Sequence, residues 1–385
     1  IDDKIIEAAV EQNVEISVIT KKFTKIYNED MAKLNVLAPD VQPKATEYIP
    51  EMIDLIKELI EKDFAYEKDG HVLFHVPTYE NYGKLSNRIK DEQIAGSRVD
   101  VADFKKDPAD FVLWKPSTGV QPGWESPWGI GRPGWHTECS AMSEKTLGLP
   151  LDIHGGGRDL IFPHHENEIA QSCCSAAENS NPESYAKYWM HNGFVTIDGE
   201  KMSKSLGNII LVNELTQKYH GEVIRLALLS THYRQALDWN DNVIHQAKKL
   251  LDKLYSLLNE LNDVKESKEP DNDSIEILLD DLNTPGLMAN INKLLKNAES
   301  LEEGDKPNLK SNLLLIGKLM GILEDKSYNQ ISSEFKDKVD NLIEDRSNAK
   351  KKRDFELADK IRSELIDLGV EINDSPEGTT WKVVK

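Results

Sequence analysis

The chain has 385 residues, of which 39% are hydrophobic and 30% charged, and its formal net charge is −20. This length predicts two or three domains with room for a real core, and the charge argues against a surface coated with nucleic acid. No apolar run approaches the roughly 18 residues of a membrane span, and the start has no signal-peptide pattern. The three cysteines, Cys139, Cys173 and Cys174, give no disulfide framework. We therefore expect a water-soluble, cytoplasmic protein with at most a local basic site.

The first forty residues have the spacing of amphipathic helices, and Pro39 and Pro43 interrupt the pattern. Two apolar stripes run along them, one formed by Ile5, Ile6, Ala9 and Val10 and the other by Val18, Phe23, Ile26 and Tyr27. The chain starts at Ile1, without a methionine and inside an expected helix. We interpret the sequence as a piece of a longer protein.

A stronger helix is predicted to open at Thr46–Pro50, because apolar residues from Met52 to Ile60 recur at i, i+3, i+4 and i+7. The dipeptide Asp69-Gly70 between two apolar runs predicts a β-hairpin. Residues 79–123 have few regular patterns, as expected of an inserted subdomain. Tryptophans buried in a core are more common than tryptophans that form ligand platforms, and we expect core roles for Trp114, Trp124, Trp128 and Trp135.

The stretch Gly131–Gln171 concentrates the residues that can do chemistry. After an Arg-Pro-Gly-Trp turn, a helix is predicted to start at Cys139 and to stop at Gly148. The next expected elements are a buried strand at Leu151–Ile153, a loop at Gly155–Gly157 and a second helix that opens at Pro163.

Three side chains of this stretch could bind a metal ion. His164 and Glu168 are four residues apart on the second helix and project from one face, and Cys139 starts the neighbouring helix. A thiolate, an imidazole and a carboxylate with an open fourth position suit a catalytic zinc ion. The same pattern also fits a buried cysteine and hydrogen-bonded histidines, and spacing alone does not decide between the two readings.

A basic loop follows at residues 198–208. Lys201 and Lys204 lie close to the hydroxyl residues Ser203 and Ser205 in the sequence. Such positive charges and hydroxyl donors can bind a polyphosphate, but the same residues also fit a solvated basic loop. Beyond it, a helical bundle with acidic faces is predicted from the patterns at 212–230, 243–261 and 275–323.

The tail changes character. Arg346–Arg362 has seven Lys or Arg residues against three Asp or Glu residues, a net charge of +4 in a chain of net −20. A basic helix, a strand at Val370–Ile372 and a terminal Trp381 are typical of a small RNA-reading module. A solvated helix face is the other reading of the same charges.

Seven segments of the chain resemble the cysteinyl-tRNA synthetase family, which belongs to the class I aminoacyl-tRNA synthetases. In chain order they are YGKLSNR, DPADFVLWK, GRPGWHTECSAM, DIHGGGRDLIFPHHENEIAQS, YWMHNGF, GEKMSKSLGN and ADKIRSELIDLGVEINDSPEGTTW. The resemblance covers essentially the whole chain, and Lys-Met-Ser-Lys-Ser is specific to class I synthetases.

The resemblance implies an α/β fold: a Rossmann-like catalytic domain with an inserted subdomain, an α-helical bundle and a small α+β anticodon-binding module. The implied regions are 1–44 (remainder of the first half of the catalytic domain), 45–127 (inserted subdomain), 128–200 (second half with the zinc site), 201–240 (signature loop and stem contact), 241–335 (bundle) and 336–385 (anticodon module). The family members are expected to act as monomers in the cytoplasm.

The activity implied by the resemblance is cysteine–tRNA ligation. ATP, with Mg²⁺, activates L-cysteine to cysteinyl-adenylate, and the aminoacyl group then passes to the 3′ end of tRNA(Cys). One Zn²⁺ per chain selects the substrate thiolate, held by Cys139, His164, Glu168 and a further cysteine upstream of Ile1. Trp135 and His154 match positions of the amino-acid pocket.

The resemblance also assigns the ATP site. Lys204, with Lys201, is expected to stabilise the charge that develops on the leaving pyrophosphate. The expected ATP contacts are His191, Lys201, Met202, Ser203, Lys204 and Ser205. The second class signature, His-Ile-Gly-His, does not occur in the sequence, so we expect these 385 residues alone to be inactive.

In the tail, family anticodon contacts correspond to Lys350, Phe355, Asp359 and Asp374, and we add Trp381. Arg and Trp are commoner at the first two positions, so stacking and bidentate contacts are expected to be weaker here. Two alternatives share parts of the pattern: a cysteine–amino-sugar ligase of mycothiol synthesis, which lacks the tRNA-reading tail, and a catalytically dead tRNA-binding fragment.

Overall fold

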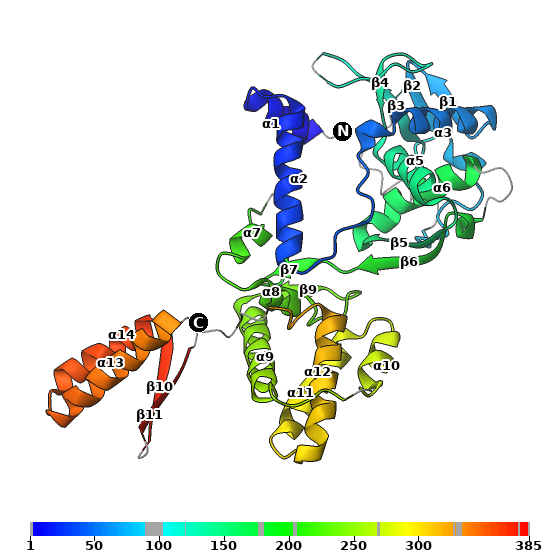
Figure 1. The fold of residues 1–385 in the computed structure, drawn as a ribbon. Helices are drawn as coiled ribbons and strands as arrows, with labels where there is room; N and C mark the ends of the chain where they lie inside the picture. Colours follow the sequence, from blue (N-terminus) through cyan, green and yellow to red (C-terminus); the bar gives the residue numbers. More distant parts are fainter. Residues whose placement is uncertain are drawn as a thin grey trace.

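The computed structural model of the chain describes residues 3–88, 103–119, 121–175, 181–202, 206–267, 270–325, 328, 333–375 and 378–383. The predicted phosphate contacts Ser203, Lys204 and Ser205 lie outside these ranges. Within them, helices surround four small sheets (Figure 1). No helix of the described ranges is both long and apolar enough to cross a bilayer.

The N-terminal part consists of the two predicted helices, α1 (Asp3–Glu11) and α2 (Ile16–Lys33). Ile6 and Ala9 of the first apolar stripe are buried. The second stripe is largely exposed, because Val18, Phe23 and Tyr27 each keep at least half of their surface in solvent. In Figure 1, α2 runs from α1 toward the bundle, and Arg225 joins the two parts by donating to the carbonyl of Leu34 at 2.9 Å.

An antiparallel sheet and one helix cover the region predicted as the inserted subdomain, and the last strand lies beyond the predicted end at residue 127. Its elements are α3 (Ile49–Glu61), β1 (Ala65–Lys68), β2 (His71–Phe74), β3 (Phe111–Pro116) and β4 (Gly131–Pro133), with strand order β1-β2-β3-β4. The predicted hairpin is confirmed, since Asp69 and Gly70 both have positive φ and join β1 to β2. The expectation of little regular structure at 79–123 is wrong for β3, whose Trp114 is fully buried.

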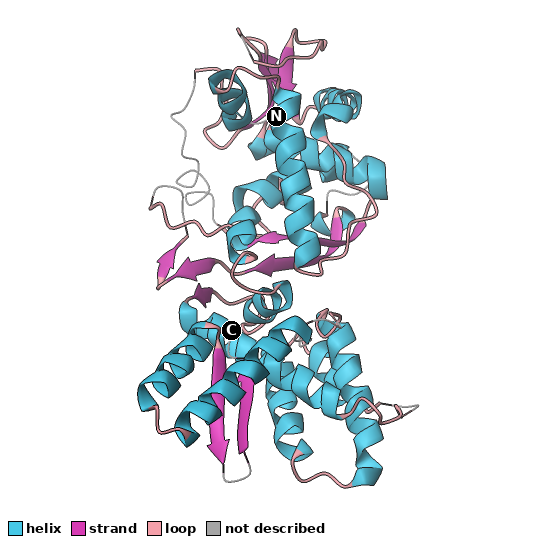
Figure 2. Cartoon of the chain, turned by 60° about the vertical axis from the view of Figure 1, so that its left-hand side comes forward, coloured by secondary structure: helices cyan, strands magenta, loops and turns pink. Residues whose placement is uncertain are grey.

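A parallel strand pair forms the centre of the region predicted to be catalytic, which we call the catalytic part. Its elements are α5 (Trp135–Leu147), β5 (Leu151–Gly157), α6 (Glu166–Ser175) and β6 (Ala186–Asn192). The pair β5–β6 with α6 between the strands in sequence is a βαβ unit, the repeating unit of doubly wound α/β folds. Figure 2 shows both strands below the helices of this part.

Three local predictions in the catalytic part are wrong. The strand at Leu151–Ile153 is not buried, since Ile153 is 60% exposed. Helix α5 begins at Trp135 instead of Cys139. The extended residue before it, Gly134, fixes this start, because it packs so closely on Val112 that a Cβ would lie 2.1 Å from the Val112 carbonyl oxygen. Gly155–Gly157 do not form a loop but continue β5, where they pair with Met190–Asn192 of β6. The predicted helix opening is confirmed: Phe162 is extended, and helical backbone runs from Pro163 into α6.

A small mixed sheet carries the start of the signature loop. Its strands are β7 (Val195–Ile197), β8 (Glu200–Lys201) and β9 (Leu237–Trp239), in the order β8-β7-β9. Two short helices lie between them in the chain, α7 (Val212–Leu215) and α8 (Gly221–Leu228). The helical pattern predicted at 212–230 is therefore split in two.

The helical bundle is confirmed, with α9 (Asp241–Glu260), α10 (Asp273–Leu279), α11 (Thr284–Ala298) and α12 (Lys306–Met320). Its core includes Leu251, Leu254, Leu313 and Ile316. Short 3₁₀ turns connect elements at Ala45–Glu47, Val76–Thr78, Arg158–Leu160, Pro182–Ser184 and Glu303–Asp305.

The tail is a separate body in Figure 1, with α13 (Ser333–Lys351), α14 (Phe355–Asp367), β10 (Val370–Ser375) and β11 (Gly378–Val383). It has its own core of Val339, Ile361, Leu365 and Val370. The single basic helix predicted across Arg346–Arg362 is wrong, because Arg353 adopts a left-handed φ of 60° and divides it into α13 and α14.

Candidate functional site

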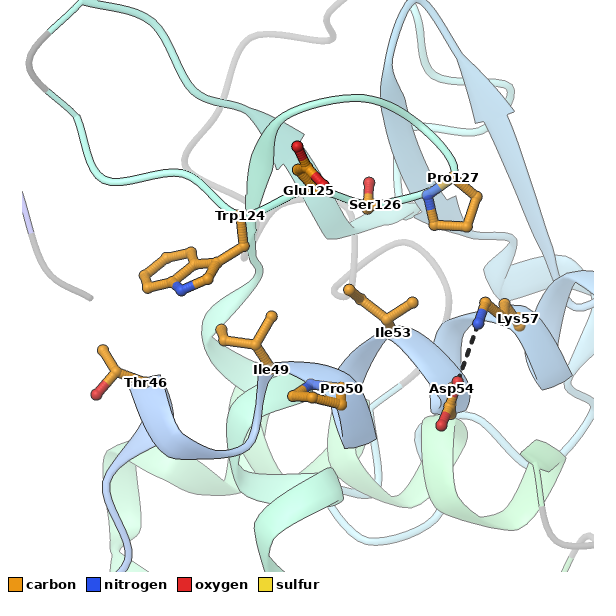
Figure 3. A pocket seen from close by; sticks show the side chains of 10 residues that line it. All are labelled: Thr46, Ile49, Pro50, Ile53, Asp54, Lys57, Trp124, Glu125, Ser126 and Pro127. Carbon is orange, nitrogen blue, oxygen red and sulfur yellow. Dashed lines mark hydrogen bonds and ion pairs between the residues drawn. The ribbon is translucent and has the colours of Figure 1, made fainter.

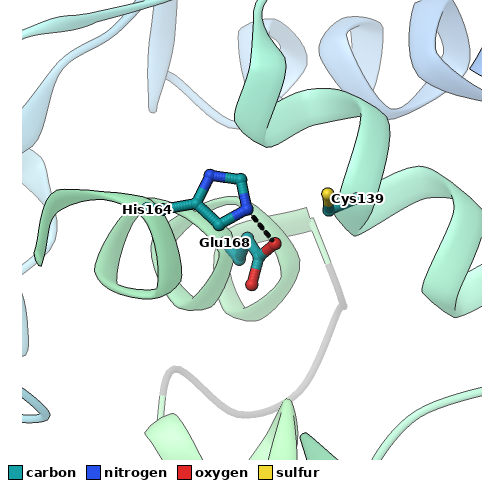
Figure 4. Close-up of side chains that lie close together, drawn as sticks. All are labelled: Cys139, His164 and Glu168. Carbon is teal, nitrogen blue, oxygen red and sulfur yellow. Dashed lines mark ion pairs between the residues drawn. The ribbon is translucent and has the colours of Figure 1, made fainter. Parts of the chain in front are cut away.

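The three predicted metal ligands converge in the structure. Cys139 of α5, His164 before α6 and Glu168 of α6 place ligand atoms within 4.8 Å of one another (Figure 4). The imidazole Nε2 of His164 lies 2.9 Å from Oε1 of Glu168, as expected of side chains four residues apart on a helical face. Both residues are at least 96% buried, since His164 is 4% and Glu168 1% exposed.

The negative charge of Glu168 favours a cation at this point. Burial raises the pKa of Glu168, but the adjacent imidazoles of His154 and His164 outweigh it and lower the pKa to about 2. Burial and then the nearby Glu168 carboxylate raise the pKa of the Cys139 thiol. A cation between the three groups would reverse the second effect, because it stabilises a thiolate.

Glu168 gives the clearest evidence that a metal fits. Its Oε2 lies 2.8 Å from His154 Nε2 and 3.4 Å from the Tyr185 hydroxyl. Its buried Oε1 has His164 Nε2 at 2.9 Å, an ion-pair contact that does not have the geometry of a hydrogen bond. One oxygen is therefore held in place while the other faces Cys139 and His164, as for a carboxylate that binds a metal through one oxygen.

Further histidines surround the three ligands. Nδ1 of His164 lies 2.7 Å from Nδ1 of His136, so one of the two nitrogens must carry the proton. Burial, and then His164, lower the pKa of His136 to about 3, which keeps His136 neutral. If His136 accepts, His164 keeps the Nε2 lone pair for a metal, the usual arrangement for a ligating histidine.

A second contact links this cluster to His191, one of the predicted ATP contacts. Nδ1 of His165 lies 2.8 Å from Nε2 of His191. His154, His165 and Glu168 also form a group whose possible ligand atoms lie within 4.8 Å of one another. No role was predicted from the sequence for His136, His165 or Tyr185; His136 and His165 lie within the quoted motifs, but nothing in their spacing indicates these contacts.

Trp135 was expected to be a core anchor, and this is wrong. Its side chain is 58% exposed, and its ring centre lies 4.2 Å from that of His164. Trp114 is fully buried and Trp124 and Trp128 are partly buried, as predicted. Trp135 is thus an exposed aromatic surface directly beside the three ligands.

On the ATP side, the structure describes Lys201 and Met202 of the signature loop. The ammonium group of Lys201 lies over the ring of Phe194, 4.4 Å from its centre, and the Lys201 side chain is exposed. The other predicted contacts of this loop lie outside the described residues.

In the tail, the predicted anticodon contacts fall into two groups. Asp374 accepts hydrogen bonds from Lys350 at 2.9 Å and from Arg346 at 2.9 and 3.0 Å, and the Trp381 indole N–H donates to Asp340 at 2.8 Å. These contacts stabilise the module itself. Phe355, 63% exposed, and the exposed Asp359 lie on its surface.

A separate open groove of about 500 Å³ lies between the start of α3 and the loop before β4 (Figure 3). Ile49, Ile53 and Trp124 give it apolar walls, and an Asp54–Lys57 ion pair of 3.0 Å lies at one end. It contains none of the predicted site residues.

Comparison with known proteins agrees with this geometry. The family model for the class I (C) tRNA synthetase catalytic domain matches residues 1–249. Cysteine--tRNA ligases of Parvibaculum lavamentivorans and Saccharophagus degradans are 54% and 49% identical to the chain, over 100% and 99% of it and 83% and 84% of their own lengths. The fold is also similar to that of Mycobacterium tuberculosis methionyl-tRNA synthetase in complex with methionyl-adenylate, with a TM-score of 0.52 at 15% identity, covering 82% of this chain and 79% of that one.

The α/β fold and the family match define a class I aminoacyl-tRNA synthetase. Within this class, the chain belongs to the cysteine--tRNA ligase family. The resemblance inferred from the sequence motifs is confirmed.

Proposed function

We propose that this enzyme activates L-cysteine with ATP and transfers it to tRNA(Cys), with zinc at the Cys139–His164–Glu168 site. The observation that carries the proposal is the convergence of these three side chains, whose possible ligand atoms lie within 4.8 Å of one another. The identity of 54% to a cysteine--tRNA ligase over the whole chain supports the substrate assignment.

The residues at the site suit a zinc ion, which prefers sulfur, nitrogen and carboxylate ligands. When bound there, zinc would offer a soft partner for the substrate thiolate, and this distinguishes cysteine from serine. His154 holds the outer oxygen of Glu168, and His136 fixes the proton on His164. Both contacts keep the ligand atoms aimed at one point before substrate arrives.

Trp135, whose ring lies beside His164, would cover the bound amino acid. His191, which lies within hydrogen-bond distance of His165, would contact ATP. Lys201 and Lys204 would stabilise the negative charge that develops as pyrophosphate leaves, and Mg²⁺ would accompany the ATP phosphates. The tail would bind the anticodon through Lys350, Phe355, Asp359, Asp374 and Trp381.

We also propose that these 385 residues do not form the adenylate by themselves. Adenylate formation needs the ATP phosphates held from two sides, and the sequence contains only one of the two class signatures. This second proposal concerns the 385 residues by themselves.

Cysteine-dependent ATP–pyrophosphate exchange tests both parts. We expect exchange from a chain extended at its start by a relative's segment that carries His-Ile-Gly-His, and none from the 385 residues alone. Serine should not replace cysteine, and Cys139→Ala should abolish the exchange. Equal rates with serine and cysteine would refute the zinc-based selection, and exchange by the 385-residue chain would refute the second proposal.

A further inference from the structure

A junction between the bundle and the catalytic part is organised by one carboxylate. Asp281 lies between α10 and α11, and it binds three consecutive residues. Its Oδ2 accepts from Arg234 Nε at 2.6 Å, and its Oδ1 accepts from Arg234 Nη2 at 3.2 Å and from the Tyr233 hydroxyl at 2.7 Å. Nε2 of His232 lies 2.9 Å from its backbone oxygen. The bundle thus holds residues 232–234 from one side.

The catalytic part binds the backbone of the same loop from the other side. The N–H of Gly193, directly after β6, donates to the carbonyl of Tyr233 at 2.7 Å. Arg158, directly after β5, donates to the carbonyl of Arg234 at 3.0 Å. No side chain fits at Gly193, because a Cβ there would lie 2.2 Å from the carbonyl oxygen of Gln235.

The loop continues into the sheet that carries Lys201. Strand β9 pairs in parallel with β7, and β7 pairs with β8, which ends at Lys201. Asp238 of β9 also holds the turn of this hairpin, since its Oδ1 accepts from Thr196 Oγ1 at 2.7 Å and from Gly199 N–H at 2.6 Å. A displacement of residues 232–235 would therefore displace the hairpin.

We propose that Asp281 is a positioning residue for the β7–β8 hairpin, and through it for Lys201 at the end of β8. The assignment of Lys201 to the ATP site rests on the proposed function. An exposed Asp–Arg pair usually contributes little to stability, so stability alone does not account for this arrangement. Asp281 and Leu282 have left-handed φ angles of 51° and 55°, which are uncommon for residues other than glycine. The backbone is held in a costly conformation that brings the carboxylate to Tyr233 and Arg234 and the backbone oxygen to His232.

Hydrogen exchange of the 385-residue chain tests the placement without any activity. In Asp281→Ala, we expect amides of residues 193–202 and 235–239 to exchange about 10-fold faster, with those of α9 and α12 unchanged. Glu303→Ala is the matched control, because Glu303 is an exposed acidic residue of the bundle whose partner is the neighbouring Lys306. Unchanged exchange at 193–202, or an equal increase throughout the bundle, would overturn the proposal.

A double-mutant cycle tests the route. If Asp281 acts through Arg234, then Arg234→Ala and the double variant should show the same local exchange as Asp281→Ala. Additive effects would overturn this route. Asp281→Asn keeps the backbone contact and one acceptor oxygen, so it should give a smaller increase than alanine.

An active, extended chain gives the functional test. Asp281→Ala should raise the KM for ATP about 10-fold and leave the KM for cysteine unchanged, a pattern that general destabilisation does not produce. Equal changes in both constants would overturn the proposal. Absence of cysteine-dependent exchange in the unmutated extended chain would instead refute the proposed function, and the hydrogen-exchange result would still decide the role of Asp281.

Discussion

Glu166 Oε1 accepts a hydrogen bond from the backbone N–H of Gly83 at 2.9 Å, which ties the inserted subdomain to the helix that carries Glu168. The second oxygen accepts from the backbone N–H of Ser86 at 3.0 Å, and Glu166 is completely buried. Backbone amides that converge on one carboxylate form a strong, charge-assisted contact. The motif Tyr82–Arg88 is thus held against the start of α6, two residues before Glu168 in the sequence.

Removing this carboxylate should destabilise the chain. Glu166→Ala would leave buried amides without partners, and we expect a loss of about 3 kcal/mol in the free energy of unfolding of the catalytic part. Glu166→Gln should cost less, because its amide oxygen can still accept from Gly83. Urea unfolding checks both, with the exposed Glu183→Gln as the control. A loss below about 0.5 kcal/mol in the alanine variant would contradict the importance of these contacts.

Zinc binding should depend both on the predicted ligand Cys139 and on His154, which holds the predicted ligand Glu168. Cys139→Ser should remove most of the bound zinc, because it replaces a thiolate ligand. His154→Ala should weaken zinc binding about 10- to 100-fold, the usual effect of losing a group that orients a ligand. Competition with a chelator measures both affinities. Cys173→Ser is the control, since Cys173 is buried elsewhere and is hydrogen-bonded to the carbonyl of Asn181. Unchanged zinc content in Cys139→Ser would refute the site.

Lys204 should act on the chemical step. In an extended, active chain, Lys204→Ala is expected to lower the rate of adenylate formation by about 10²-fold, the scale of one transition-state charge contact. The KM for cysteine should not change. Pre-steady-state adenylate formation measures the rate, and the exposed Lys218→Ala serves as the control. A variant with weaker cysteine binding but normal turnover would contradict this role.

The tail should lose stability in acid. The Arg346 guanidinium, with Lys350 and Thr379, holds the pKa of Asp374 well below its usual value. A carboxylate whose pKa is lower in the folded state contributes stability above its unfolded pKa of about 4, and this contribution disappears as the pH falls below that value. Hydrogen exchange of residues 370–383, corrected for the intrinsic rate, should therefore accelerate between pH 5.5 and pH 3. Asp374→Asn should remove most of this pH dependence, and an identical acceleration in that variant would contradict the assignment.

Binding of tRNA by the tail should weaken as salt increases. Lys351 and Lys352 are exposed cations that can neutralise phosphates, and each phosphate contact adds about one unit to the slope of log K against log salt. Filter binding of the 385-residue chain at about 50 to 200 mM salt measures this slope, because the affinity for nucleic acid changes strongly over that range. Lys351→Ala should reduce the slope, whereas Lys293→Ala in the bundle should not. Binding that is independent of salt would contradict the role of the tail.

Sequence patterns predicted the elements whose structure depends on interactions between residues close together in the chain. The spacing in α3, the Asp69-Gly70 hairpin and the i, i+4 pair His164–Glu168 all depend on residues close in sequence. The resemblance, not spacing, favours a metal site over a hydrogen-bonded histidine pair.

The missed features depend on partners far along the chain. Gly155–Gly157 have low strand propensity, and they are extended because β6 pairs with them from more than thirty residues away. The contact of His136 with His164 joins residues 28 positions apart. Such contacts follow from tertiary packing, which no local period indicates.

The left-handed turn at Arg353 changes how the basic run of the tail presents its charge. Because α13 and α14 lie side by side (Figure 1), residues 350–353 are gathered at the end of a helical hairpin instead of being spread along one face. Lys350 is paired with Asp374, and the exposed Lys351, Lys352 and Arg353 add their potentials at this point. Salt limits the reach of that potential to about 8 Å at physiological ionic strength. The acidic remainder of the chain repels a polyanion, so this hairpin end is where an approaching phosphate backbone first meets an attractive field.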